Sequence, residues 1–188
     1  MKLLRLAFAG ALAFISVVLP AFAAEDDYLT IELKDGPVVV ELLPDAAPKH
    51  VERLKELAAK GEYDNVAFHR VIEGFMAQTG DVEFGDMEDG FNAARAGTGG
   101  SQLPDLPAEF SQLPFERGTV GMARSQDPDS ANSQFFIMFD EGSFLNGQYT
   151  VVGKVVSGME NVDKIKRGEG GNGEVSDPDR IVKVTVGR

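Results

Sequence analysis

The sequence contains no cysteine and no tryptophan, and only two histidines occur among its 188 residues. Without cysteine the chain can form no disulfide, and it has no thiol to carry a lipid anchor. Zinc sites in proteins are built mainly from cysteine and histidine. With only His50 and His69 available, we expect no metal site of this kind.

Positive charge is also scarce, because 18 basic residues stand against 30 acidic ones and the net charge is −12. Two of the basic residues and none of the acidic ones lie in residues 1–23, so residues 24–188 carry a net charge of −14. Nucleic acids and anionic membranes repel such a surface. We therefore expect no nucleic acid and no membrane as a partner of this part of the chain.

The chain has one long apolar run, from Leu6 to Leu19, with basic residues before it and small residues after it. As a helix this run would span about 21 Å, which is less than the roughly 30 Å hydrocarbon core of a bilayer. The order of basic, apolar and small residues is typical of a signal peptide. We expect a signal peptide over residues 1–23 and a single domain over residues 24–188, with an uncleaved membrane anchor as the alternative.

Short runs of β-branched and aromatic residues alternate with glycine-rich turns along most of the remaining chain. Asp35-Gly36 separates the first two runs and predicts a hairpin. Many short strands with few helices indicate a mainly β fold, either a sandwich or a barrel. The eight runs expected as strands are residues 28–34, 38–42, 68–72, 75–80, 119–123, 134–139, 150–155 and 181–186.

Two helices are expected. In Pro48–Lys60, apolar residues recur every three or four positions with charges between them, and Gly61 follows as a stop signal. A second, shorter helix is expected over Val162–Lys166.

Two segments, residues 83–114 and 168–179, are rich in glycine, aspartate and proline and are expected as loops. Acidic residues cluster in the first loop, especially in residues 83–96, and oxygen ligands of this kind could in principle hold calcium. Their spacing differs from that of an EF-hand loop, so a solvated acidic face is the preferred interpretation. The cluster could also favour substrates with basic flanking residues.

Two further motifs carry the functional signal. Residues 68–81 read FHRVIEGFMAQTGD, and residues 121–137 begin with GMAR and end with NSQFFI. Considered separately, Arg70 could be an edge charge with its stem over apolar surface, and Phe75, Met76 and Phe136 could be ordinary core residues. No serine lies in a Gly-x-Ser-x-Gly elbow, which argues against a serine hydrolase.

Together these stretches resemble the cyclophilin family of peptidyl-prolyl isomerases. The first matches the family's Phe-His-Arg-x-Ile-x-x-Phe-Met-x-Gln-x-Gly-Asp signature, and the second matches its Met-Ala followed by Ser-Gln-Phe-Phe. The resemblance runs from about Tyr28 to Val186 and includes further short matches at residues 97–100, 144–147, 152–155 and 158–159.

The resemblance implies a closed eight-stranded antiparallel β-barrel capped by two α-helices. It also implies a groove on the outside of the barrel, in which Arg70 is the catalytic residue and His69 beside it is a structural hydrogen-bonding residue. The residues expected to bind substrate are Phe75, Met76, Gln78, Ala123, Arg124 (chiefly through its backbone), Gln134, Phe136, Leu145 and Tyr149.

The implied activity is cis/trans isomerisation of the peptide bond before proline, with Arg70 stabilising the twisted amide. The reaction breaks no covalent bond, so no metal and no other cofactor is expected. Partners would be proline-containing polypeptides, namely unfolded or folding exported proteins, and the protein would be a monomer in the periplasm, or secreted if the host has a single membrane. A non-catalytic holdase or assembly partner on the same barrel is the alternative.

Three positions depart from the pattern of many eukaryotic members of the family. Phe144 stands where those members have tryptophan, Tyr149 where they have histidine, and Arg124 where they have asparagine. The resemblance therefore implies a groove whose rim differs from theirs.

Overall fold

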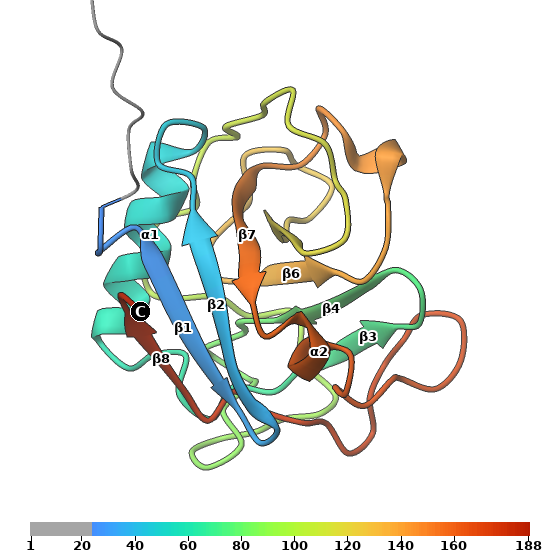
Figure 1. Cartoon of the computed structure of the whole chain (residues 1–188). Coiled ribbons are helices and arrows are strands. Elements are labelled where there is room, and N and C mark those ends of the chain that lie inside the picture. The colour runs from blue at the N-terminus through green and yellow to red at the C-terminus, as the bar shows by residue number, and fades with distance from the viewer. Residues whose placement is uncertain (1–23) are drawn as a thin grey trace, which may run out of the picture.

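The structure is a computed structural model that describes residues 24–188. The expected signal peptide, residues 1–23, lies outside the described residues. Eight strands dominate the fold (Figure 1), and each of the eight expected strands is present with its ends shifted by at most two residues. They are β1 Tyr28–Leu33, β2 Gly36–Leu42, β3 Arg70–Ile72, β4 Met76–Thr79, β5 Thr119–Met122, β6 Phe135–Met138, β7 Val151–Ser157 and β8 Lys183–Val186.

The opening hairpin forms as the sequence predicts. Leu33 pairs with Gly36 at the end of β1 and β2, so Lys34 and Asp35 make a two-residue turn. Gly36 has a φ of +129°, a conformation open to glycine and strained for other residues.

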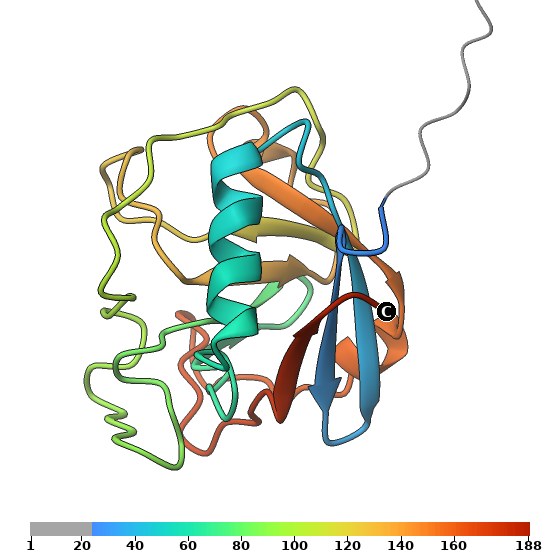
Figure 2. The same cartoon turned by 90° about the vertical axis from the view of Figure 1, so that its left-hand side faces the viewer.

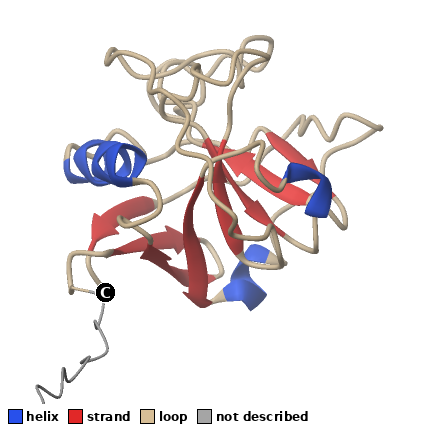
Figure 3. Cartoon of the chain, turned by 90° about the horizontal axis from the view of Figure 1, so that it is seen from above, coloured by secondary structure: helices blue, strands red, loops and turns tan. Residues whose placement is uncertain are grey.

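The eight strands form one antiparallel sheet in the order β3-β4-β6-β5-β7-β2-β1-β8. Seen from above, the sheet curls around a common centre, and long loops gather on one side of it (Figure 3). The edge strands β3 and β8 are not paired with each other, so the sheet is open. The prediction of a closed barrel is wrong.

The physical reason lies in the segment between the two edges. β3 has only three residues, and the glycine-rich loop 168–181 hydrogen-bonds beside it in place of a further strand. Val71 N–H donates to Gly173 O at 2.7 Å, and Ile181 N–H donates to Val66 O at 2.9 Å. Because Gly173 has a φ of +74°, the loop cannot continue as an extended strand.

The first helix, α1, spans Pro48–Ala59 and lies alongside the sheet (Figure 2), with contacts to β8. Its apolar positions face inward as the sequence spacing predicts. The second helix, α2, covers Met159–Val162 in place of the expected Val162–Lys166. It begins directly after Gly158, whose left-handed φ of +83° ends β7 and turns the chain. A short 3₁₀ helix, η1, covers Ser143–Leu145.

Alternation along the strands divides the apolar residues into two clusters. The larger cluster fills the inside of the curled sheet under α1 and contains Val71, Ala77 and Ile137. The smaller one lies on the opposite face and contains Met76, Phe136 and Met138. The second cluster is the apolar base of the candidate site. None of the helices within residues 24–188 is long and apolar enough to span a membrane.

The long segment between β4 and β5 contains no named strand or helix, as predicted, and buried polar side chains hold it in place. The carboxylate of Asp81 is fully buried and accepts backbone N–H groups from Glu83, Phe84, Gly97 and Gly99 at 2.7–3.1 Å. These hydrogen bonds fix the conformation of a loop whose backbone N–H groups have no partner strand.

Candidate active site

The pairing of four neighbouring strands places the key side chains in one row. Arg70 on β3 lies opposite Gln78 on β4, Gln78 lies opposite Phe136 on β6, and Phe136 lies opposite Gly121 on β5. Directly paired residues share a face of a sheet. Arg70, Gln78 and Phe136 therefore lie side by side on the outer face.

A groove of about 270 Å³ opens along this row. Its base is apolar and buried, with Met76 2%, Phe136 5% and Leu145 7% exposed, whereas Phe144 at the rim is 64% exposed. Nine of the ten residues predicted for the site line the groove, and Gln134 does not. The lining residues are Arg70, Phe75, Met76, Gln78, Ala123, Arg124, Phe136, Phe144, Leu145 and Tyr149.

Aromatic rings fix the base of the groove from behind. Phe136 stacks on Phe115 with ring centroids 5.7 Å apart, and the ring of Tyr149 lies nearly perpendicular to that of Phe136 with centroids 5.9 Å apart. A Cβ on Gly121 would lie 2.6 Å from both phenylalanine rings, so only glycine allows this stack. Sequence reasoning missed Phe115, because an aromatic residue in an irregular loop carries no periodicity that assigns it to a site.

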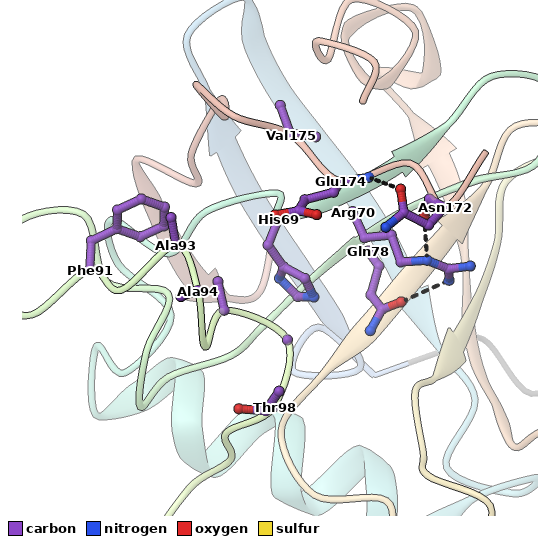
Figure 4. A pocket seen from close by; sticks show the side chains of 12 residues that line it. His69, Arg70, Gln78, Phe91, Ala93, Ala94, Thr98, Asn172, Glu174 and Val175 are labelled. Atoms are coloured by element: carbon purple, nitrogen blue, oxygen red, sulfur yellow. Dashed lines mark hydrogen bonds between the residues drawn. The ribbon is translucent and has the colours of Figure 1, made fainter. Parts of the chain in front are cut away.

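The polar side of the groove is a chain of side-chain hydrogen bonds. Arg70 donates from Nη1 to Gln78 Oε1 at 3.3 Å and from Nε to Asn172 O at 2.9 Å (Figure 4). Gln78 in turn donates to Gln134 Oε1 at 3.0 Å, and Gln134 donates to Gly99 O at 2.8 Å. Gln134 thus orients Gln78 from the side. Asn172 was not predicted, because it acts through its carbonyl and lies 102 residues from Arg70.

A second hollow of about 350 Å³ adjoins the groove, and Gln134 lines it. Gln78, Ala123 and Arg124 border both hollows, so together they form one continuous surface depression. Gln134 and Phe136 are two residues apart and so point to the same face of the sheet. Phe136 lines the groove, however, whereas Gln134 lines the neighbouring hollow.

The comparisons with known proteins agree with this geometry. The family model described as "Cyclophilin type peptidyl-prolyl cis-trans isomerase/CLD" matches residues 28–186. The chain belongs to the cyclophilin family. It is therefore an enzyme, a peptidyl-prolyl cis-trans isomerase, and the recognition of the family from its motifs is confirmed.

Among curated relatives, a "Probable peptidyl-prolyl cis-trans isomerase" of Brucella suis is 64% identical over 99% of this chain and 97% of its own length. "Peptidyl-prolyl cis-trans isomerase B" of Escherichia coli is 36% identical over 73% of this chain and 83% of its own. A Cryptosporidium parvum cyclophilin, crystallised in the presence of the dipeptide Ala-Pro, is 27% identical with a TM-score of 0.73, covering 86% of this chain and 99% of its own.

At Arg124, one of the positions where the resemblance implies a departure from many eukaryotic members, backbone carbonyls hold the side chain. The guanidinium donates from Nε and Nη2 to Gln148 O at 3.2 and 2.9 Å and from Nη1 to Ser125 O at 2.8 Å. Its Cζ lies 4.4 Å from the centre of the Tyr149 ring. Sequence reasoning assigned Arg124 chiefly a backbone role, and the structure adds a side-chain contact that holds Tyr149 at the groove wall.

His69 does not have the hydrogen-bonding role expected of it. The residue is 6% exposed, and within residues 24–188 neither ring nitrogen makes a hydrogen bond of normal geometry. Burial lowers the pKa of His69, although the nearby carboxylate of Asp81 opposes this shift. Its neutral ring instead packs against the backbone of Gly97, where a Cβ would lie 2.9 Å from the ring. Within residues 24–188, no three His, Cys, Asp or Glu side chains converge as metal ligands would.

Proposed function

We propose that this cyclophilin rotates the peptide bond before proline with Arg70 as its catalytic residue. The observation that carries the proposal is the position of Arg70, half-buried at the edge of an apolar groove. Within residues 24–188, two of the five N–H bonds of its guanidinium have acceptors, on Gln78 and Asn172. The other three are available to a bound peptide.

The chemistry explains why an arginine suits this reaction. The barrier of roughly 18–20 kcal/mol is the amide resonance lost as the C–N bond twists. In the twisted state the proline nitrogen becomes pyramidal and regains a lone pair, so a donor aimed at it is stronger in the transition state than in either planar state. Such differential binding lowers the barrier. Arg70 can donate to this nitrogen and to the proline carbonyl together, and it remains charged at any working pH.

The groove and the adjoining hollow can hold different parts of a bound peptide. A proline ring fits the apolar base formed by Phe75, Met76, Phe136 and Leu145, where burial of the ring favours binding. The preceding residues would lie along Gln78, Ala123 and the backbone at Arg124 toward the compartment that Gln134 lines. Rotation about the C–N bond then moves one side of the peptide while the apolar base holds the proline ring, and the reaction requires no cofactor.

We further propose that the substrates are exported proteins and that the enzyme works as a monomer in the periplasm, or outside the cell if the host has one membrane. The pattern of residues 1–23 and the lack of cysteine support this location. Cell fractionation with an antibody to residues 24–188 tests it, and recovery of the protein in the cytoplasm with residues 1–23 still attached would contradict it.

The central experiment measures isomerisation of proline peptides by the wild type, Arg70→Ala and Arg70→Lys. Loss of a preorganised donor to a transition state typically lowers the rate about 100-fold or more, and we expect a loss of that order in kcat/KM for Arg70→Ala. Arg70→Lys should recover little of the activity, because an ammonium group cannot span both atoms.

Arg180→Ala is the matched control, since it removes an exposed arginine that does not line the groove. Full activity of Arg70→Ala would refute the mechanism. A wild-type rate equal to the uncatalysed one, together with suppression of aggregation, would instead support a holdase on the same fold.

A further inference from the structure

A third hollow, of about 280 Å³, lies beside Arg70 and shares Gln78, Gly97 and Thr98 with the compartment that Gln134 lines. It shares Arg70 and Gln78 with the groove, so a peptide bound in the groove can reach it. In Figure 4, Phe91, Ala93 and Ala94 lie on one side of this hollow, and Arg70, Asn172 and Glu174 lie on the other. Phe91 and the alanines come from one loop, Asn172 and Glu174 come from another about 80 residues further along the chain, and Arg70 lies on β3.

The walls differ in chemistry. One is apolar, made by Phe91 and the alanines, and buried Val175 also lines the hollow. On the opposite wall, the exposed carboxylate of Glu174 has no ion-pair partner within the described part of the chain. His69 also lines the hollow, and its buried ring carries no hydrogen-bond partner and no charge at neutral pH, because burial lowers its pKa.

The charged groups that line the hollow are Arg70 and Glu174. The backbone oxygen of Asn172 and the side-chain oxygen of Gln78 already accept hydrogen bonds from Arg70 and hold it at the groove. Glu174 has no ion-pair partner in the described part of the chain. The loops that carry the two walls are strongly acidic. Residues 83–96 contain four acidic residues and one basic residue, and residues 168–179 contain four acidic residues and no basic one. This excess of negative charge favours a cation.

We propose that the hollow is a subsite for a lysine or arginine side chain of the polypeptide substrate, within about three residues of the proline. The aliphatic stem would lie over Phe91 and the alanines while the charged head meets Glu174, which is how long basic side chains cover apolar surface. This inference rests on the proposed function, because it needs a peptide in the groove. It makes the enzyme selective for proline sites that have a basic neighbour.

The test uses a set of proline peptides in which lysine, norleucine or glutamate occupies, in turn, each of the three positions on either side of proline. Norleucine keeps the aliphatic stem without the charge. An exposed ion pair contributes about 0.2–1 kcal/mol, so we expect lysine to exceed norleucine in kcat/KM about threefold at one position. This advantage should fall as salt is raised from about 50 to about 500 mM.

Two variants separate a local contact from the overall negative charge. In Glu174→Gln the ratio of kcat/KM for the lysine peptide to that for the norleucine peptide should fall to about one. Glu52→Gln removes the same charge from an exposed site on α1 and should preserve this ratio. An equal ratio at all positions, or a preference for glutamate, would overturn the subsite while leaving the isomerase intact. If norleucine peptides themselves are not turned over, the proposed function fails first.

Discussion

The carboxylate of Glu109 is a cap supplied to α1 from a distant loop, and we predict that Glu109→Gln destabilises the protein. The residue before the helix is Ala47, whose side chain makes no cap. Glu109 accepts the backbone N–H groups of Lys49 and His50 at 3.1–3.2 Å and the Nδ1–H of the His50 ring at 2.7 Å. A negative charge thus lies at the positive end of the helix dipole.

The magnitude follows from these contacts. Losing a helix cap costs about 0.5–2 kcal/mol, and losing a hydrogen bond to a charged group costs about 1.5–3 kcal/mol. Glutamine keeps one acceptor oxygen in place, so we expect a decrease of about 2 kcal/mol in the free energy of unfolding at pH 7. For a domain of this size, that corresponds to a fall in Tm of about 4–8 °C. Urea titration and thermal melting followed by circular dichroism measure both.

The same contacts predict the pH dependence of stability. Burial raises the pKa of Glu109, but hydrogen bonds from the His50 ring and the two backbone N–H groups outweigh it, and the pKa lies below its ordinary value of 4.5. A carboxylate with a lowered folded-state pKa contributes stability above its unfolded pKa and loses it as the pH falls through the folded value. The difference between wild type and Glu109→Gln should therefore shrink below about pH 4.5.

Glu52→Gln is the control for this prediction, because Glu52 is exposed on the same helix, and we expect it to change stability by less than about 0.5 kcal/mol. Equal stability of wild type and Glu109→Gln at pH 7 would refute the capping argument. A difference that persists unchanged at low pH would refute the assignment to the ionised carboxylate.

Two further predictions concern the groove. Gly121→Ala forces a Cβ to within 2.6 Å of the Phe136 ring, and overpacking of this kind costs about 1–3 kcal/mol. We therefore expect kcat/KM for peptide isomerisation to fall about tenfold or more. Normal activity of the variant would contradict this prediction. Arg124→Ala removes the contact with Tyr149, worth about 0.5–1 kcal/mol, so KM should rise about two- to fivefold at unchanged kcat. Arg124→Lys should restore this only in part, and a fall in kcat alone would show that Arg124 acts in some other way.

Much of the fold could be predicted from local sequence. Runs of β-branched and aromatic residues between glycine-rich turns identified all eight strands, because such side chains pack well on the pleated surface of a sheet. The hairpin turn at Lys34-Asp35, directly before Gly36, and the helix from Pro48 also have local causes, namely turn chemistry and amphipathic spacing. By contrast, α2 was placed three residues too late, because its start depends on the left-handed conformation of Gly158 at the end of β7.

The candidate site was partly predictable as well. Arg70, Phe75, Met76 and Gln78 were found because they lie in one continuous motif. Their partners were not all found, because each contact joins segments far apart in the chain. Phe115 behind the groove, the carbonyl of Asn172 on Arg70 and the carboxylate of Glu109 on α1 come from loops with no periodic pattern.

The sequence by itself therefore determined the strands and the family, since these follow from local propensity and contiguous motifs, and the resemblance to the family named nine of the residues that line the groove. Only the tertiary structure decided that the sheet is open, that His69 packs without a hydrogen bond and that Arg124 holds Tyr149. It also placed Glu174 across a hollow from Phe91. Each of these depends on how loops approach the sheet, and that approach is fixed by backbone hydrogen bonds and steric contacts between residues that local sequence does not connect.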